Sequence, residues 1–320
     1  MMKLFKKFAL TLTALGVASL GLANTVFAID TTVINEKWGK PIVVYGGGLS
    51  DQQADQTAKL LKISNKENVN VEVATGQDLI KFLGSGDGNS SSMISSVLVQ
   101  KQDPGKGVDV QILTPDNITL ITAQQYANAA ITAGVTDAKI EVASISKVTG
   151  ESALTGVYKA FEANGETLDT SRTEVAQEEL ETTNKISQEN AKTEGFDPAR
   201  LDQAMIEIKQ ALADLKTQTD KLATKEDIER IVNEALANNK LQSVVSQENI
   251  NQIVNFASNY QQTSAIDSNQ VKEQLNQLSQ TVTQKFGELV NRAQNEGWLD
   301  KIGQFFQQLF ESIKNLFSGQ

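Results

Sequence analysis

The strand-forming pattern of this chain ends at Gly165, and that boundary constrains the fold more than any other feature of its 320 residues. Between residues 40 and 165, short apolar and β-branched runs alternate with segments of helical periodicity. Beyond Gly165 only the helical periodicity continues. This pattern predicts an α+β protein, with a mixed α/β domain over residues 29–165 and an all-helical region over residues 166–320.

Turn and cap chemistry places the elements more closely. Strands are predicted at residues 41–45, 69–73, 93–99, 108–113 and 140–148. The run Asp103-Pro104-Gly105-Lys106-Gly107 is strong turn chemistry, so we expect the third and fourth strands to pair as an antiparallel hairpin. Ser50 with Gln53, and Thr122 with Gln125, have the spacing of capping boxes. In the second region helices are predicted at residues 168–188, 198–222, 226–237, 247–259 and from residue 270 onward.

The first 28 residues have the features of a secretory signal peptide. Three lysines precede an uncharged apolar run at residues 8–22, and Val26-Phe27-Ala28 resembles a cleavage site. The run is shorter than the roughly 20 residues that a membrane span needs, which disfavours the alternative of an uncleaved anchor. We therefore predict export to the cell envelope or exterior, with cleavage after Ala28 and a mature chain that begins at Ile29.

The chain contains no cysteine and no histidine. Disulfide frameworks, thiolate and HExxH metal sites, and nucleophiles activated by histidine are therefore excluded. Any catalysis has to use carboxylates, lysine, tyrosine or hydroxyl groups. This composition favours a non-enzymatic protein without a cofactor or a metal ion.

The charge balance is acidic. The leader contains three lysines and no acid, so its removal changes the net charge from −10 to −13. Phosphate backbones are bound by basic surfaces, and nucleic acid is therefore not an expected partner.

A set of spaced motifs gives the chain a family resemblance. The motifs are Leu49-Ser50-x-x-Gln53, Ile118-Thr119-x-Ile121-Thr122-x-x-x-Tyr126-x-x-Ala129, Gly134-x-x-Asp137-Ala138 and the run at residues 148–156. Together they resemble a family of secreted Gram-positive bacterial proteins catalogued as domain of unknown function 1002. The resemblance is clearest over residues 40–168. It implies export and an α/β portion followed by helices, and it supplies no activity and no catalytic residues.

The densest polar motif lies at residues 149–156, between a predicted strand and a predicted helix. Open α/β sheets bind ligands at such positions, so this motif is the predicted ligand-binding site. Glu151 has the chemistry to hold a cation or to act as a base. A structural explanation is also available, in which Thr149 caps the helix, Glu151 complements its dipole and Gly156 permits close packing. The candidate ligand-binding residues are Thr149, Gly150, Glu151, Ser152 and Thr155.

Three further polar segments are weaker candidates for sites. The N–H groups of Gly46-Gly47-Gly48 suit an anion at a helix start, but the run lacks the known phosphate-loop patterns, and glycine with a positive φ in a tight turn is the favoured explanation. The loop at residues 87–90 lacks the acidic ligands of a calcium loop. A run of glutamates, interpreted as a solvated helix face, comprises Glu174, Glu178, Glu179 and Glu181.

The last predicted helix, at residues 297–317, is strongly amphipathic. Such a helix can dock on a membrane surface or on a partner, or it can pack into the core of the protein itself. Its polar face has few basic residues, which gives little support to lipid binding. The residues of its apolar face are Trp298, Leu299, Ile302, Phe305, Phe306, Leu309, Phe310, Ile313 and Phe317.

Three functions follow from these observations. The favoured one is an exported binding protein that contacts an envelope protein or a wall polymer. The second is a carboxylate-dependent cell-wall hydrolase in which Glu151 is the acid. The third is a membrane-surface protein docked by the helix at residues 297–317.

Overall fold

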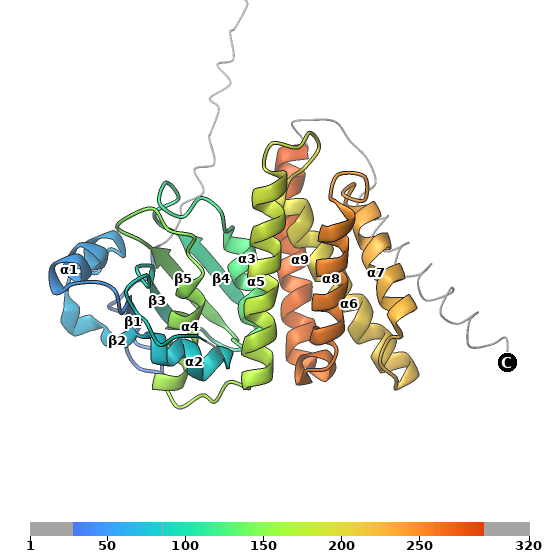
Figure 1. Ribbon diagram of the computed structural model, residues 1–320. Coiled ribbons are helices and arrows are strands. Elements are labelled where there is room, and N and C mark those ends of the chain that lie inside the picture. The colour runs from blue at the N-terminus through green and yellow to red at the C-terminus, as the bar shows by residue number, and fades with distance from the viewer. Residues whose placement is uncertain (1–27, 85, 291–320) are drawn as a thin grey trace, which may run out of the picture.

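A computed structural model of the chain describes residues 28–84 and 86–290 (Figure 1). Its first half contains a five-stranded mixed sheet in the order β2-β1-β3-β5-β4. β1 runs parallel to β2 and β4 parallel to β5, whereas β3 is antiparallel to both of its neighbours. The predicted α+β class is confirmed, since the chain beyond the sheet is helical as far as the structure describes it. The strands are β1 (Ile42–Gly46), β2 (Asn70–Ala74), β3 (Ser96–Lys101), β4 (Val108–Ile112) and β5 (Ala138–Ala143).

The predicted hairpin between the third and fourth strands is wrong, because β5 lies between β3 and β4. The turn residues still act locally, with φ of +84° at Gly105 and +71° at Gly107. β5 is buried on both faces except at Lys139, and a strand buried in this way is stabilised by neighbours along both edges. The chain therefore leaves β3, turns, and forms β4 one position further along the sheet.

Helices cover both faces of the sheet (Figure 1). α1 (Asp51–Leu60) covers one face, where Ala58 shares a small apolar cluster with Val43 and Leu98. The opposite face is covered by α2 (Gly76–Leu83), α3 (Ala123–Ala133) and α4 (Ser152–Ala163). The capping boxes predicted at the starts of α1 and α3 are both present.

The second half adds a wall of helices beside this layer. These are α5 (Thr170–Asn190), α6 (Pro198–Thr219), α7 (Lys225–Asn238), α8 (Gln247–Tyr260) and α9 (Asn269–Val290). They stand side by side next to the sheet, with α5 closest to it in this view (Figure 1). Asp197 caps α6 and Pro198 occupies its first turn, as their sequence predicts.

Helix α3 joins the two halves. It contacts β4 on one side and α5, α6 and α9 on the others. Every residue from 125 to 133 is buried, and four of these nine are alanines. Small side chains let neighbouring helices approach α3 closely, so one hydrophobic core extends from Ile140 of the sheet to Ile206 of α6.

An ion pair lies inside this junction. Lys209 of α6 and Glu179 of α5 are both inaccessible to solvent, and Lys209 Nζ lies 2.8 Å from Glu179 Oε1. Lys209 Nζ also donates to the Asn128 carbonyl oxygen and to Thr132 Oγ1, at 3.2 and 2.9 Å. Thr132 Oγ1 in turn donates to Glu179 Oε2 at 2.6 Å. Two charges thus enter the core because α3 supplies the hydrogen bonds that replace water.

We predict that Lys209→Met destabilises the protein strongly, because it leaves the Glu179 carboxylate buried without its cation. The free energy of unfolding should fall by about 3–5 kcal/mol, as measured by urea denaturation. Lys216→Met is the matched control, since Lys216 lies on the same helix and pairs with the fully exposed Asp220. The control should leave stability nearly unchanged. Equal losses in the two variants would contradict this role for the ion pair.

Candidate functional site

The predicted ligand-binding motif lies in the loop after β5 and at the start of α4. Gly150 is buried there with φ of +95°, and its carbonyl oxygen accepts a hydrogen bond from the Tyr126 hydroxyl at 2.6 Å. A Cβ on Gly150 would overlap that hydroxyl. Glycine is therefore required at this position by both the backbone conformation and the close contact.

The polar side chains of the motif point in different directions. Glu151 Oε1 accepts from Asn184 Nδ2 at 2.8 Å, and Ser152 Oγ lies 2.7 Å from Ser95 Oγ. Thr149 is exposed, whereas Thr155 is buried and its hydroxyl has no hydrogen-bond partner among the described residues. The structure thus brings Glu151 and Ser152 to the helix start and places Thr155 in the core. Ligand binding by these residues stays a prediction.

The structural explanation of the motif is partly right. Thr149 does not cap α4, because the residue at the N-cap position is Glu151 and its side chain makes no capping hydrogen bond. Gly156 does permit close packing, since a Cβ there would lie 3.0 Å from a methyl group of Val97 on the sheet.

The run Gly46-Gly47-Gly48 is not available to an anion, because its N–H groups are already bonded. Gly47 N donates to the Ala74 carbonyl oxygen at 2.8 Å, and Gly48 N to that of Met93 at 3.0 Å. The predicted positive φ is also wrong at all three positions. Glycine is needed instead because a Cβ at each would collide with a neighbouring backbone carbonyl.

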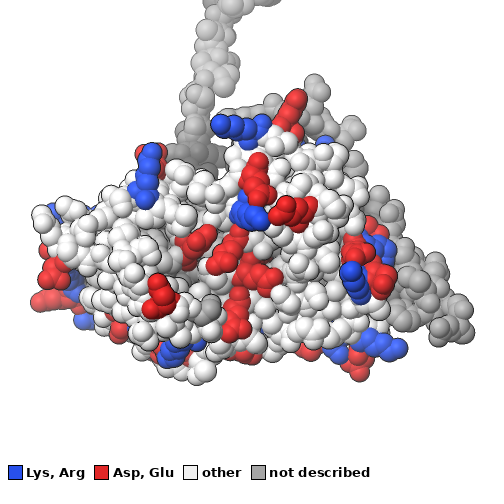
Figure 2. Space-filling view, in the orientation of Figure 1, with Lys and Arg blue, Asp and Glu red and all other residues white. Residues whose placement is uncertain are grey.

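Acidic side chains form a band over α5 on the face shown in Figure 2. Glu174 and Glu181 are exposed and Glu178 is half-buried, which agrees with the predicted solvated face. Glu179 departs from that interpretation, since it points inward to Lys209. A helix presents residues spaced by three or four on one face, so Glu178 and Glu179 necessarily diverge.

A pocket that the sequence did not predict lies between the sheet edge and α9. Its cavity has a volume of about 160 Å³. Its lining includes three apolar residues, Val110, Ala127 and Leu278, and three glutamines, Gln124, Gln274 and Gln277. The remaining lining residues are Lys106, Gly107, Val108, Asp109, Ala123 and Thr281. Gln274, Gln277 and Thr281 are spaced by three and four residues on one helix, and this polar stripe was the signal in the sequence.

β4 forms one wall of the pocket and is an edge strand of the sheet. Ala138 N donates to the Gly107 carbonyl oxygen and Leu113 N to that of Val142, which fixes the groups that face β5. Backbone groups alternate in direction along a strand, so every second residue of β4 faces away from β5. No described residue donates to or accepts from these outward groups. They belong to Val108, Val110 and Ile112.

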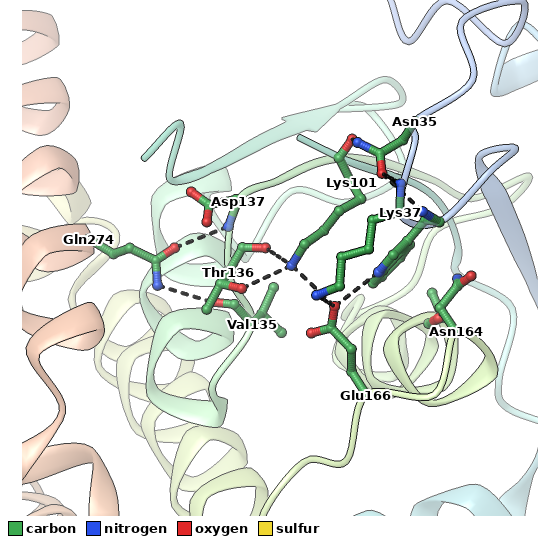
Figure 3. A network of polar contacts seen from close by, with 11 residues as sticks. Asn35, Lys37, Lys101, Val135, Thr136, Asp137, Asn164, Glu166 and Gln274 are labelled. Carbon is green, nitrogen blue, oxygen red and sulfur yellow. Dashed lines mark hydrogen bonds and ion pairs between the residues drawn. The ribbon is translucent and has the colours of Figure 1, made fainter. Parts of the chain in front are cut away.

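Two glutamines of α9 hold the pocket wall in place. Gln274 Nε2 donates to the Val135 carbonyl oxygen at 3.2 Å, and Gln274 Oε1 accepts from Asp137 N at 3.4 Å (Figure 3). Asp137 Oδ1 accepts from Gly107 N at 2.9 Å. Gln277 Nε2 donates to the Gly105 carbonyl oxygen at 3.2 Å. The helix is therefore joined to the loops that precede β4 and β5.

The loop at residues 134–137 is also held from the sheet side. Lys101 Nζ donates to the carbonyl and hydroxyl oxygens of Thr136, at 2.7 and 2.9 Å, and lies 3.4 Å from Glu166 Oε1 (Figure 3). Burial lowers the pKa of the Lys101 ammonium group. The loop thus cannot shift without breaking hydrogen bonds on two sides, which makes the pocket a rigid feature.

The lining of the pocket is mainly neutral. The two acids whose pKa values burial raises to about 7, Asp202 and Glu207, lie inside the helical core and do not line it. Its titratable side chains are those of Lys106 and Asp109, and its other lining residues are neutral polar or apolar. Amides both donate and accept hydrogen bonds, so they suit an uncharged polar ligand such as a peptide backbone.

The amphipathic helix predicted at residues 297–317 lies outside the described residues. Within residues 28–84 and 86–290, no helix is long and apolar enough to cross a membrane. The same residues contain no group of three or more acidic side chains arranged to hold a metal ion.

Comparison with known proteins gives a family but no activity. The family model described as "Protein of unknown function (DUF1002)" matches residues 45–278. The uncharacterized protein YpuA of Bacillus subtilis is 30% identical over 287 residues, covering 87% of this chain and 90% of that protein. No solved structure matches the chain.

The buried acid Asp202 gives a prediction about pH. Burial raises its pKa from 3.8 to about 7, against the hydrogen bond that Thr122 Oγ1 donates to its Oδ2. The folded state therefore binds the proton more tightly than the unfolded state, and this contribution to stability is lost as the pH rises from about 4 through 7. Asp202→Asn should remove this pH-dependent loss of stability.

The free energy of unfolding of Asp202→Asn, relative to the unchanged protein, should rise between pH 5 and pH 8 by a few kcal/mol, in order of magnitude. Urea denaturation at both pH values measures it. Asp116→Asn, in the exposed loop after β4, is the control and should show no such change. A constant difference at both pH values would contradict a neutral Asp202 in the folded protein.

Proposed function

The chain belongs to the DUF1002 family of proteins of unknown function, and we propose that it is an exported, non-enzymatic protein that binds an extended segment of a partner polypeptide along β4. The observation that carries this proposal is a strand edge, with outward backbone groups that bond to no described residue, beside a pocket. Strand addition uses the main-chain groups of such an edge for affinity and an adjacent pocket for specificity. The outward N–H and C=O groups of Val108, Val110 and Ile112 supply the edge.

The size of the pocket supports a peptide ligand. Pockets for drug-sized molecules have volumes of about 300–1,000 Å³. A cavity of about 160 Å³ suits a single side chain of a longer ligand whose backbone lies outside the cavity. The apolar part of the lining and its amide groups suit a side chain that combines a carbon skeleton with an uncharged polar group.

Two features of the sequence support the export and non-enzymatic parts of the proposal. The leader at residues 1–28 has the basic start, apolar run and cleavage site of a secretory signal. The absence of histidine and cysteine excludes hydrolases that use Ser-His-Asp or Cys-His nucleophiles. The hydrolase alternative assigns its acid to Glu151. The Glu151 carboxylate accepts hydrogen bonds from Asn184 and Thr149, and no second described acid takes part in these hydrogen bonds.

Peptide binding can be tested without knowing the natural partner. A library of random peptides displayed on phage is selected against the chain that begins at Ile29, and enriched peptides are synthesised for fluorescence anisotropy. Thr281→Trp fills the mouth of the pocket and should weaken their binding by about tenfold or more. Gln280→Trp is the matched control, because Gln280 is exposed on the same helix and does not line the pocket. Binding to the control should be unchanged.

Strand addition has a second signature, since only alternate amides of the added strand bond to the edge. Methylating single backbone nitrogens of an enriched peptide should abolish binding at every second position. Failure to enrich peptides, or equal binding to the two tryptophan variants, would overturn the proposal.

Export is tested separately by producing the full 320-residue precursor in a Gram-positive secretion host. The chain should be recovered outside the cytoplasm with the mass of a polypeptide that begins at Ile29. Retention of the intact precursor in the cytoplasm would overturn export, and it would leave the peptide-binding result unaffected.

A further inference from the structure

The backbone nitrogen of Ile29 lies in the core of the protein. It donates to Glu141 Oε1 at 2.6 Å, and the Ile29 side chain is only 5% exposed. That side chain belongs to the apolar cluster between the sheet and α1, together with Val43 and Leu98. A residue at the start of the described chain is thus packed like an interior residue.

Glu141 is an unusual partner for an amide. It lies on β5, is fully inaccessible to solvent, and forms no ion pair with a described lysine or arginine. Its second oxygen, Oε2, is buried and has no hydrogen-bond partner among the described residues. Burial raises the pKa of this carboxyl, and the hydrogen bond from Ile29 and the charges of Lys139 and Lys62 oppose the rise. A cation in direct contact would offset the desolvation of this buried carboxylate.

Cleavage at the site predicted from the sequence would provide that cation at the Ile29 nitrogen, the atom that already donates to Glu141. Hydrolysis of the Ala28–Ile29 peptide bond consumes one water, leaves a carboxylate on Ala28, and turns the Ile29 nitrogen into an amine. An α-amine has a pKa of about 7.7–8.0, so it carries a proton at neutral pH. The sequence and the structure arrive independently at one nitrogen: the leader motif as the new terminus, and the fold as the donor to a buried acid.

We propose that removal of the leader creates an α-ammonium group on Ile29 that forms a buried ion pair with Glu141 and fastens the N-terminal segment to the sheet. This inference rests on the proposed export, because it requires cleavage after Ala28. An amide has one hydrogen and reaches one carboxylate oxygen, whereas an ammonium has three hydrogens and a positive charge. Cleavage therefore completes the partners of Glu141.

The segment that the proposed ion pair would fasten, from Ile29 to Trp38, is hydrogen-bonded to the sheet. Gln100 Nε2, on β3, donates to the Asp30 and Val33 carbonyl oxygens at 3.5 and 3.4 Å. Asn35 Nδ2 donates to the Lys101 carbonyl oxygen at 3.3 Å. The segment thus continues along the sheet to Trp38.

At its far end the segment meets the network around Lys101. Trp38 packs edge-on against Phe161 of α4, with ring centroids 4.6 Å apart, and its Nε1 donates to Glu166 at 2.9 Å. Glu166 also pairs with Lys101, which holds the loop at residues 134–137 and so the wall of the pocket. The N-terminal ion pair is therefore one end of a continuous chain of contacts that reaches the proposed binding site.

The test is a double-mutant cycle on four leaderless chains. Two begin at Ile29, released from a cleavable fusion, and two retain Ala28 as the first residue. One of each pair carries Glu141→Gln. Retaining Ala28 moves the charged amine one residue away without changing the net charge. It should lower the folding equilibrium constant by about 100-fold when Glu141 is present, and only slightly in the Glu141→Gln chains.

Equal stability of the Ile29-first and Ala28-first chains with Glu141 would overturn the proposal. A similar loss in both backgrounds would also overturn it, because the loss would then come from the extra residue rather than from the charge.

A second measurement does not require Glu141→Gln to fold. An amine-acylating ester is added to the native chains, and mass spectrometry of the N-terminal peptide follows the labelling. The Ile29 amine should be protected until the chain unfolds, whereas the Ala28 amine should react at once. Rapid labelling of native Ile29 would overturn the proposal.

These chains carry no leader, so failure of export in the precursor experiment does not decide their outcome. A secreted chain that begins at a residue other than Ile29 would, however, overturn the inference and leave export standing.

Discussion

The ion pair between Lys209 and Glu179 determines how the two halves of this protein fit together. Two opposite charges can be buried only if nearly all of their hydrogen bonds are made, and here Asn128 and Thr132 of α3 make them. α5 and α6 must therefore meet α3 at one position along its length. Hydrophobic packing alone tolerates small shifts between helices, whereas a shift here leaves a charge without a partner.

The position of α9 depends on the same junction. α9 packs on both α3 and α6, so the register of those helices decides where its polar stripe lies. Gln274 and Gln277 then reach carbonyl groups in the loops before β5 and β4, more than 130 residues earlier in the chain. The pocket is in this sense a product of the helical half, although the strand that forms its wall belongs to the sheet.

The sequence predicted the parts of this structure that depend on neighbouring residues. The capping boxes at Ser50 and Thr122, the Asp197-Pro198 helix start and the purely helical pattern of the described residues after Gly165 are all local patterns. The strand order was not predictable in the same way, because turn chemistry between β3 and β4 does not reveal that β5 lies between them.

The contact partners of individual side chains could not be predicted from the sequence, for the same reason. Glu179 resembles its solvated neighbours until Lys209, 30 residues away, is placed beside it. Gly47 and Gly48 lie in the predicted turn and Gly46 ends β1, and glycine is needed at all three because carbonyl groups of distant segments crowd them, not because of a positive φ. The candidate motif at residues 149–155 was located correctly at a helix start, whereas the orientation of Thr155 followed from packing.

The edge position of β4 also affects how these molecules behave toward one another. A strand edge does not distinguish a ligand from the edge of a second copy, so an edge without protection promotes aggregation. The charged side chains of Lys106 and Asp109 are exposed beside this edge, and charges at an edge disfavour such pairing. The surface also bears a band of acids over α5 (Figure 2), and the repulsion between the acidic surfaces of two molecules acts over only about 8 Å at physiological ionic strength. Concentrated brine therefore weakens the electrostatic barrier that keeps neighbouring molecules from sharing a sheet.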